Sequence, residues 1–99
     1  MKIEVSSVFQ KFVESHLVGP GLEAYLLQRK AILGDKEPRG HFHRVLKLGG
    51  KVLVIEYYLS LKLDTLYVLS GHVVKAGEKR DQEQKIIKGY VERIKEMEE

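Results

Sequence analysis

The pair Gly49-Gly50 constrains the fold more than any other feature, because it joins two β-rich segments, 42–48 and 51–60. Both central positions of a type I′ hairpin turn need a positive φ, which glycine adopts without steric cost. A two-residue turn at this point fixes the strand register, so that the numbers of paired residues sum to 99. The expected pairs are Leu48 with Lys51, Leu46 with Leu53, Arg44 with Ile55, and Phe42 with Tyr57.

Alternation along these strands predicts one sheet face that packs on helices and one that stays open. The pairs above are mostly apolar and belong to the covered face. The opposite face pairs His43 with Glu56 and His41 with Tyr58. In a third β-rich segment, 65–75, positions 66, 68, 70 and 72 form the more polar set and are expected on the open face. That face would then carry His41, His43, Lys47, Glu56, Tyr58, Ser70 and His72.

The other segments predict helices and one short strand. Residues 2–5 alternate polar and apolar, and Ser6 or Ser7 can cap a following helix. Gly19-Pro20-Gly21 ends that helix, and a second one over 22–33 would complete an antiparallel helical hairpin. Apolar residues at helical spacing predict a last helix over about 79–98. The predicted fold is one α+β domain over 1–99, β-α-α-β-β-β-α, with the hairpin packed on a small antiparallel sheet and a C-terminal helix.

The positive charge is concentrated in one block. The chain of 99 residues holds 17 Lys and Arg against 14 Asp and Glu, a net charge of +3. Residues 28–51 hold seven basic and two acidic side chains, so this block alone carries 7 − 2 = +5. Such a block attracts phosphate groups, or it is an ordinary solubilising surface. Abundant Lys and Glu are also typical of thermophiles.

Composition excludes several classes of protein. The absence of cysteine excludes disulfides, thiolate metal sites and cysteine nucleophiles. No apolar run reaches the roughly 18 residues of a membrane-spanning helix. The start of the chain lacks the pattern of a signal peptide. We therefore expect a small basic protein of the cytoplasm that makes no contact with membranes.

The residues of the predicted open face suit acid–base chemistry on RNA. Imidazole exchanges protons near neutral pH, and a carboxylate beside it orients the ring. A tyrosine can position the substrate or donate a proton, and lysine stabilises developing negative charge. The predicted catalytic residues for metal-free RNA cleavage are His43, Lys47, Glu56, Tyr58 and His72. Alternatively, His43 and Glu56 are an inert cross-strand pair on the surface.

The spacing His41-x-His43 also fits a metal ion, since both imidazoles lie on one strand face. Glu56 or His72 would then supply a third ligand, as zinc prefers. Paired histidines are common by chance, however, and the sequence as a whole predicts neither a metal nor another cofactor.

The order of elements and the segment 66–79 resemble the RelE/ParE toxin superfamily, and its HigB-like, phage-derived branch most of all. The apolar strand 66–70, Gly71, Lys75 and the charged helix after Lys79 carry this resemblance, together with the segment 45–50 around Lys47. It implies a translation-inhibiting endoribonuclease that acts on ribosome-bound mRNA and is neutralised by a small antitoxin protein. ParE-type relatives poison gyrase instead. The residues expected to bind RNA are Arg39, His41, Arg44, Lys51, Lys75, Lys79 and Arg80.

The chain also departs from the family pattern. The arginine that nuclease members carry on the middle strand would fall near Val52 or Val54. The activity would then have been altered, moved to the histidines or lost. Two further hypotheses follow: a catalytically inactive module that binds nucleic acid or protein, and an assembly protein that forms a homodimer through its C-terminal helix.

Overall fold

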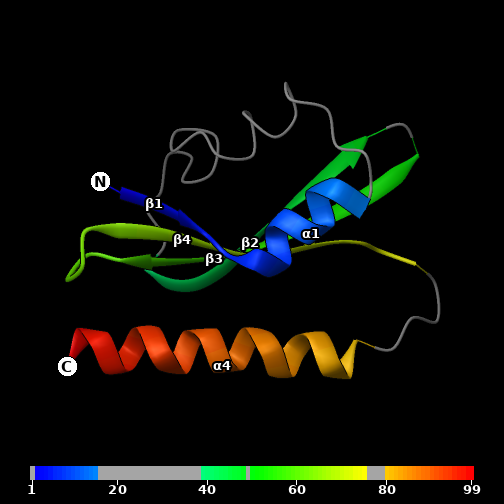
Figure 1. Ribbon diagram of the computed structural model, residues 1–99. Coiled ribbons are helices and arrows are strands. Elements are labelled where there is room, and N and C mark those ends of the chain that lie inside the picture. Colours follow the sequence, from blue (N-terminus) through cyan, green and yellow to red (C-terminus); the bar gives the residue numbers. More distant parts are fainter. Residues whose placement is uncertain (1, 16–38, 49, 76–79) are drawn as a thin grey trace.

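The computed structural model describes residues 2–15, 39–48, 50–75 and 80–99. A four-stranded sheet lies between two helices, α1 on one face and α4 on the other (Figure 1). The elements are β1 Lys2–Val5, α1 Ser7–Ser15, β2 Gly40–Leu48, β3 Lys51–Ser60, β4 Thr65–Val73 and α4 Asp81–Glu98.

The predicted hairpin register is confirmed over the whole of β2 and β3. Leu48 pairs with Lys51, and the pairing continues without a shift to His41 and Tyr58. Gly50 adopts a φ of +81°, as the tight turn requires. The predicted strand 2–5, the strand 51–60 and the start of the helix after Ser6 are also confirmed.

The predicted fold class is wrong in two respects. The described residues form the order β-α-β-β-β-α, without the predicted helical hairpin, and the predicted second helix over 22–33 lies outside them. The sheet is mixed rather than antiparallel, because β1 pairs parallel with β4, from Lys2 opposite Thr65 to Val5 opposite Val68. A strand of four residues carries no signal for its partner or direction, so the sequence could not reveal this pairing.

α1 begins where its sequence predicts and covers one face of the sheet. Ser6 is the N-cap, since its Oγ accepts a hydrogen bond from the Phe9 amide at 3.1 Å. The same hydroxyl donates to the carbonyl of Leu69, which ties the start of the helix to β4. Phe9 and Phe12 are buried against residues of β3 and β4, in the main hydrophobic core. Full burial of each ring stabilises the fold by about 1.5–3 kcal/mol.

The expectation of an open sheet face is wrong, because α4 covers much of that face. Ile87 and Ile94 of the helix are buried against Tyr58 of β3 and Leu69 of β4. Figure 1 shows α4 running along the sheet on the side opposite α1. No helix among the described residues is long and apolar enough to cross a membrane.

A bulge in β4 explains which of its side chains face α4. Glu56 pairs with Ser70 and Tyr57 with Val68, so Leu69 is an extra residue in β4. Val68 therefore belongs to the core under α1, whereas Leu69 packs with α4. The predicted set 66, 68, 70 and 72 is divided between the two faces, because alternation changes phase at the bulge.

Candidate active site

The centre of the candidate site is a contact between β2 and β3. Nε2 of His41 lies 2.6 Å from Oε2 of Glu56. The Glu56 side chain is 9% exposed, whereas that of His41 is 40% exposed. An ionised carboxylate only accepts hydrogen bonds, so Nε2 is the donor. In the neutral ring this tautomer leaves a lone pair on Nδ1, available to accept a proton.

His41 lines a cleft of about 360 Å³ between β2 and α4. We call it the β2–α4 cleft. Lys88 and Lys95 contribute positive charge to its helix wall, and Glu92 contributes one negative charge. These positions recur along one flank of α4 at helical spacing, beside the buried Ile87. An acid–base group therefore lies in a cleft whose helix wall carries two lysines and one glutamate.

Two other β2 residues predicted for catalysis lie outside this cleft. His43 and Lys47 are exposed on the same strand face as His41. The backbone of His43 pairs with Glu56, as predicted, but the carboxylate bonds the ring of His41. The partner of Glu56 is thus a diagonal neighbour rather than the residue directly opposite.

Tyr58 is buried under the C-terminal end of α4. Its hydroxyl donates to Oε1 of Glu98 at 2.7 Å, and Ser60 donates to Oε2 of the same carboxylate at 2.8 Å. Burial, followed by the bond to Glu98, raises the pKa of Tyr58 to about 12. The same bond, with that from Ser60, lowers the pKa of Glu98. This arrangement holds the end of α4 on the sheet and keeps the Tyr58 hydroxyl away from the β2–α4 cleft.

His72 is buried at the other end of α4. Its Nδ1 lies 3.3 Å from Oε1 of Glu83, and the side chain is 8% exposed. Nε of Arg80 lies 3.5 Å from the other oxygen of Glu83. His72 and Arg80, predicted respectively for catalysis and RNA binding, therefore share one carboxylate at the start of α4. These contacts hold the start of α4 against the sheet.

The remaining residues predicted to bind RNA are distributed over the molecule. Arg39, Lys51 and Lys75 are exposed, and Arg44 belongs to the strand positions that face α1. The guanidinium of Arg44 lies 5.2 Å from the centre of the Phe42 ring. Lys79 lies outside the described residues. The structure thus brings only His41 of this set into the β2–α4 cleft.

The residues that the structure describes contain no cluster of side chains that would support a metal site at His41 and His43. No group of three or more His, Asp or Glu side chains in these segments is placed to hold a metal ion. Glu56 bonds His41, while His72 pairs with Glu83 on α4.

Sequence reasoning missed the contribution of α4. No role was predicted from the sequence for Lys88, Lys95 or Glu98 of this helix. Their spacing along one flank was visible in the sequence, but which flank faces β2 follows only from the packing of Ile87 and Ile94. A scan against protein-family models found no match, and neither did searches of curated proteins and of solved structures.

Proposed function

We propose that the chain is the toxin component of a toxin–antitoxin system, a metal-independent endoribonuclease of the RelE/ParE type, and that RNA is cleaved in the β2–α4 cleft. The observation that carries this proposal is the 2.6 Å contact between His41 and Glu56 beside a cleft lined by Lys88 and Lys95. What supports the proposal is that Glu56 orients the imidazole and that two lysines, which can bind a phosphate, line the same cleft.

The chemistry would follow from these groups alone. Nδ1 of His41 accepts the proton of a ribose 2′-hydroxyl, and the freed oxygen attacks the adjacent phosphorus. The bond from phosphorus to the 5′-oxygen breaks, and a lysine ammonium of the cleft protonates this leaving oxygen. The products are a 2′,3′-cyclic phosphate and a 5′-hydroxyl. Glu56 holds the ring and stabilises the imidazolium that forms, while Lys88 and Lys95 offset the charge on the phosphate.

The cellular setting belongs to the same proposal. The substrate would be mRNA in the cytoplasm, including mRNA on ribosomes, and a small antitoxin protein would block the cleft or the helix beside it. A homodimer through α4 is harder to form than the sequence suggests, because Ile87 and Ile94 already pack on the sheet of their own chain. Ile86 and Met97 are the large apolar side chains that α4 leaves exposed.

One observation favours a non-catalytic alternative. Tyr58 and His72, two of the five residues predicted for catalysis, are buried and bonded to α4. If His41 cannot act without them, the cleft would bind RNA and leave it intact. The protein would then be an inactive RelE-like binding module.

The test is cleavage of a labelled single-stranded RNA by the purified protein in the presence of EDTA. The proposal expects cleavage that EDTA does not abolish, products ending in a 2′,3′-cyclic phosphate, and growth arrest when the protein is expressed without a partner. His41→Ala, purified identically, controls for contaminating nucleases. Salt-dependent RNA binding with no cleavage would favour the binding module. The absence of both would reject the proposal and the alternative together.

A further inference from the structure

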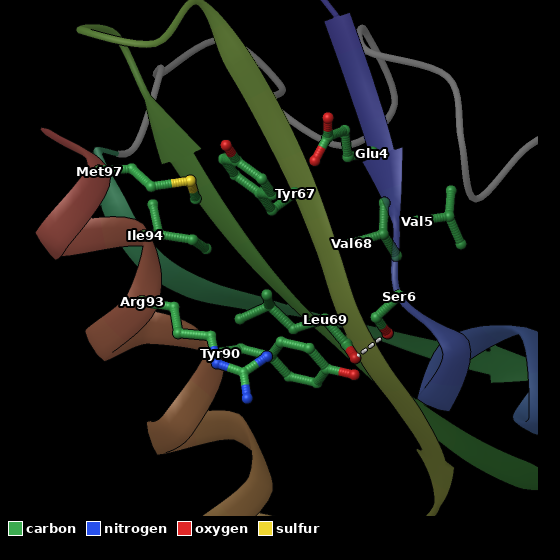
Figure 2. A pocket seen from close by; sticks show the side chains of 10 residues that line it. All are labelled: Glu4, Val5, Ser6, Tyr67, Val68, Leu69, Tyr90, Arg93, Ile94 and Met97. Carbon is green, nitrogen blue, oxygen red and sulfur yellow. Dashed lines mark hydrogen bonds between the residues drawn. The ribbon is translucent and has the colours of Figure 1, made fainter.

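A second cavity lies between α4 and the strands β1 and β4 (Figure 2). Its lining residues on α4 belong to a different flank of the helix from those of the β2–α4 cleft. Its volume is about 190 Å³. Drug-sized ligands occupy pockets of roughly 300–1,000 Å³, so this pocket suits a smaller molecule or one flat part of a larger one.

Aromatic and aliphatic side chains make up most of the wall. Tyr67 comes from β4 and Tyr90 from α4, and the surface between them includes Leu69, Ile94 and Met97. Figure 2 shows these side chains converging from the strand and the helix. Flat rings with aliphatic neighbours favour a flat, unsaturated ligand that can stack.

Two opposite charges lie among these apolar groups. Glu4 of β1 lies at the end of the pocket near Tyr67, and Arg93 of α4 lies at the end near Tyr90 (Figure 2). Glu4 contacts Lys2 at 2.9 Å, an exposed pair that a ligand can displace at little cost. Arg93 makes no ion pair with any residue that the structure describes. The pocket therefore offers a carboxylate acceptor at one end and a free guanidinium fork at the other.

Burial, followed by the charge of Glu4, raises the pKa of Tyr67. A tyrosine hydroxyl is protonated at neutral pH without any shift, and that of Tyr67 lies beside the carboxylate as a further hydrogen-bonding group (Figure 2). This adds a second polar group at the Glu4 end and a third in the pocket as a whole.

We propose that this pocket binds a guanine base, stacked on Tyr67 or Tyr90 and recognised at its edges by Glu4 and Arg93. Arginine donates two parallel hydrogen bonds to the acceptors O6 and N7 of guanine. A carboxylate accepts from the N1–H and the N2 amino group of the same base. Adenine presents an amino donor where guanine has O6, and an acceptor at N1, so both charged residues would meet the wrong partner.

The base can come from a free guanine nucleotide or from a guanosine within RNA. In either case the ribose and phosphate would remain outside the pocket, because its volume accommodates little more than the base. The inference stands apart from the proposed function, since the pocket and the β2–α4 cleft lie on different flanks of α4 and share no lining residue.

The test is titration of the folded chain with guanosine 5′-monophosphate and, separately, with adenosine 5′-monophosphate. Binding is measured by calorimetry and by the NMR shifts of the two tyrosines. The guanine nucleotide should bind at least about tenfold more tightly, the discrimination typical of one bidentate contact. Glu4→Gln and Arg93→Gln should each weaken guanine binding by about tenfold or more. Lys85→Ala, an exposed change on α4 outside the pocket, should leave it unchanged.

Equal affinity for the two nucleotides, full affinity in Arg93→Gln, or no binding at millimolar nucleotide would overturn the inference. Glu4 and Arg93 are both exposed, so their variants should fold, and circular dichroism checks this. The trinucleotide UpGpU separates the two sources of the base. Tighter binding than the mononucleotide supports a base within RNA, and weaker binding supports a free nucleotide. Both outcomes retain the guanine pocket, and neither depends on RNA cleavage.

Discussion

Gly71 and Gly89 offer a matched test of how α1 packs on the sheet. A Cβ added at Gly71 would lie 2.6 and 2.7 Å from two carbons of the Phe12 ring and 2.9 Å from Cδ1 of Ile55. Carbon atoms in contact prefer roughly 3.5–4.0 Å, so each contact is too short by up to about 1 Å. Neither neighbour can move into solvent, because Phe12 is 5% exposed and Ile55 is fully buried.

We expect Gly71→Ala to lower the free energy of unfolding by about 2–3 kcal/mol, near the upper end for overpacking. For a domain of this size that corresponds to a fall in Tm of roughly 8–24 °C. Gly89 lies within α4 and has no atom within 4 Å of an added Cβ. Gly89→Ala should therefore raise stability by about 0.5–1 kcal/mol, the difference in helix propensity.

The assay is urea denaturation of both variants and the wild type, monitored by far-UV circular dichroism. Opposite shifts of the two midpoints, with similar slopes, are the expected result. A Gly71→Ala variant as stable as the wild type would show that Phe12 does not pack against β4 as described. That result would also refute the position of α1, because Phe12 belongs to this helix.

Three further predictions concern the N-cap of α1, the bond between Tyr58 and Glu98, and the lysines of the β2–α4 cleft. Ser6→Ala removes the N-cap of α1 and should cost about 1 kcal/mol by urea denaturation, whereas no loss would contradict the cap. Because the bond from Tyr58 lowers the pKa of Glu98 in the folded chain, its contribution to stability is present above the ordinary pKa and is lost as pH falls through the lowered one. Glu98→Gln should therefore flatten the fall in Tm on acidification, and an unchanged profile would contradict the contact. Lys88→Ala and Lys95→Ala should each weaken RNA binding for all sequences and reduce the salt slope by about 1, and unchanged slopes would place RNA elsewhere.

The register of the β2–β3 hairpin could be predicted because it depends on local chemistry. Gly50 allows the tight turn, and the alternation of apolar and polar side chains along β2 and β3 selects one register. The bulge at Leu69 has no comparable local signal, so the phase change along β4 was missed. Parallel pairing of β1 with β4 depends on contacts between residues more than 60 positions apart, such as Lys2 with Thr65, which one sequence does not encode in any readable pattern.

The candidate site was predicted in its residue types but not in its arrangement. Alternation correctly placed His41, His43 and Glu56 on one face, yet it could not show that Glu56 reaches the diagonal His41. That choice depends on side-chain rotamers and on the cover provided by α4. Tyr58 was expected in the open, because the sequence does not show that the helix returns over the sheet and bonds its hydroxyl.

The most direct test of the central claim compares the RNA cleavage rates of His41→Ala and His43→Ala in EDTA. Both histidines are exposed to solvent on the same face of β2, but only His41 contacts Glu56 and lines the β2–α4 cleft. Loss of the acid–base group should slow cleavage by about 100-fold or more in His41→Ala. His43→Ala should stay within about threefold of the wild type, as an ordinary surface change. Equal losses in the two variants, a larger loss in His43→Ala, or no cleavage by the wild type would contradict the claim.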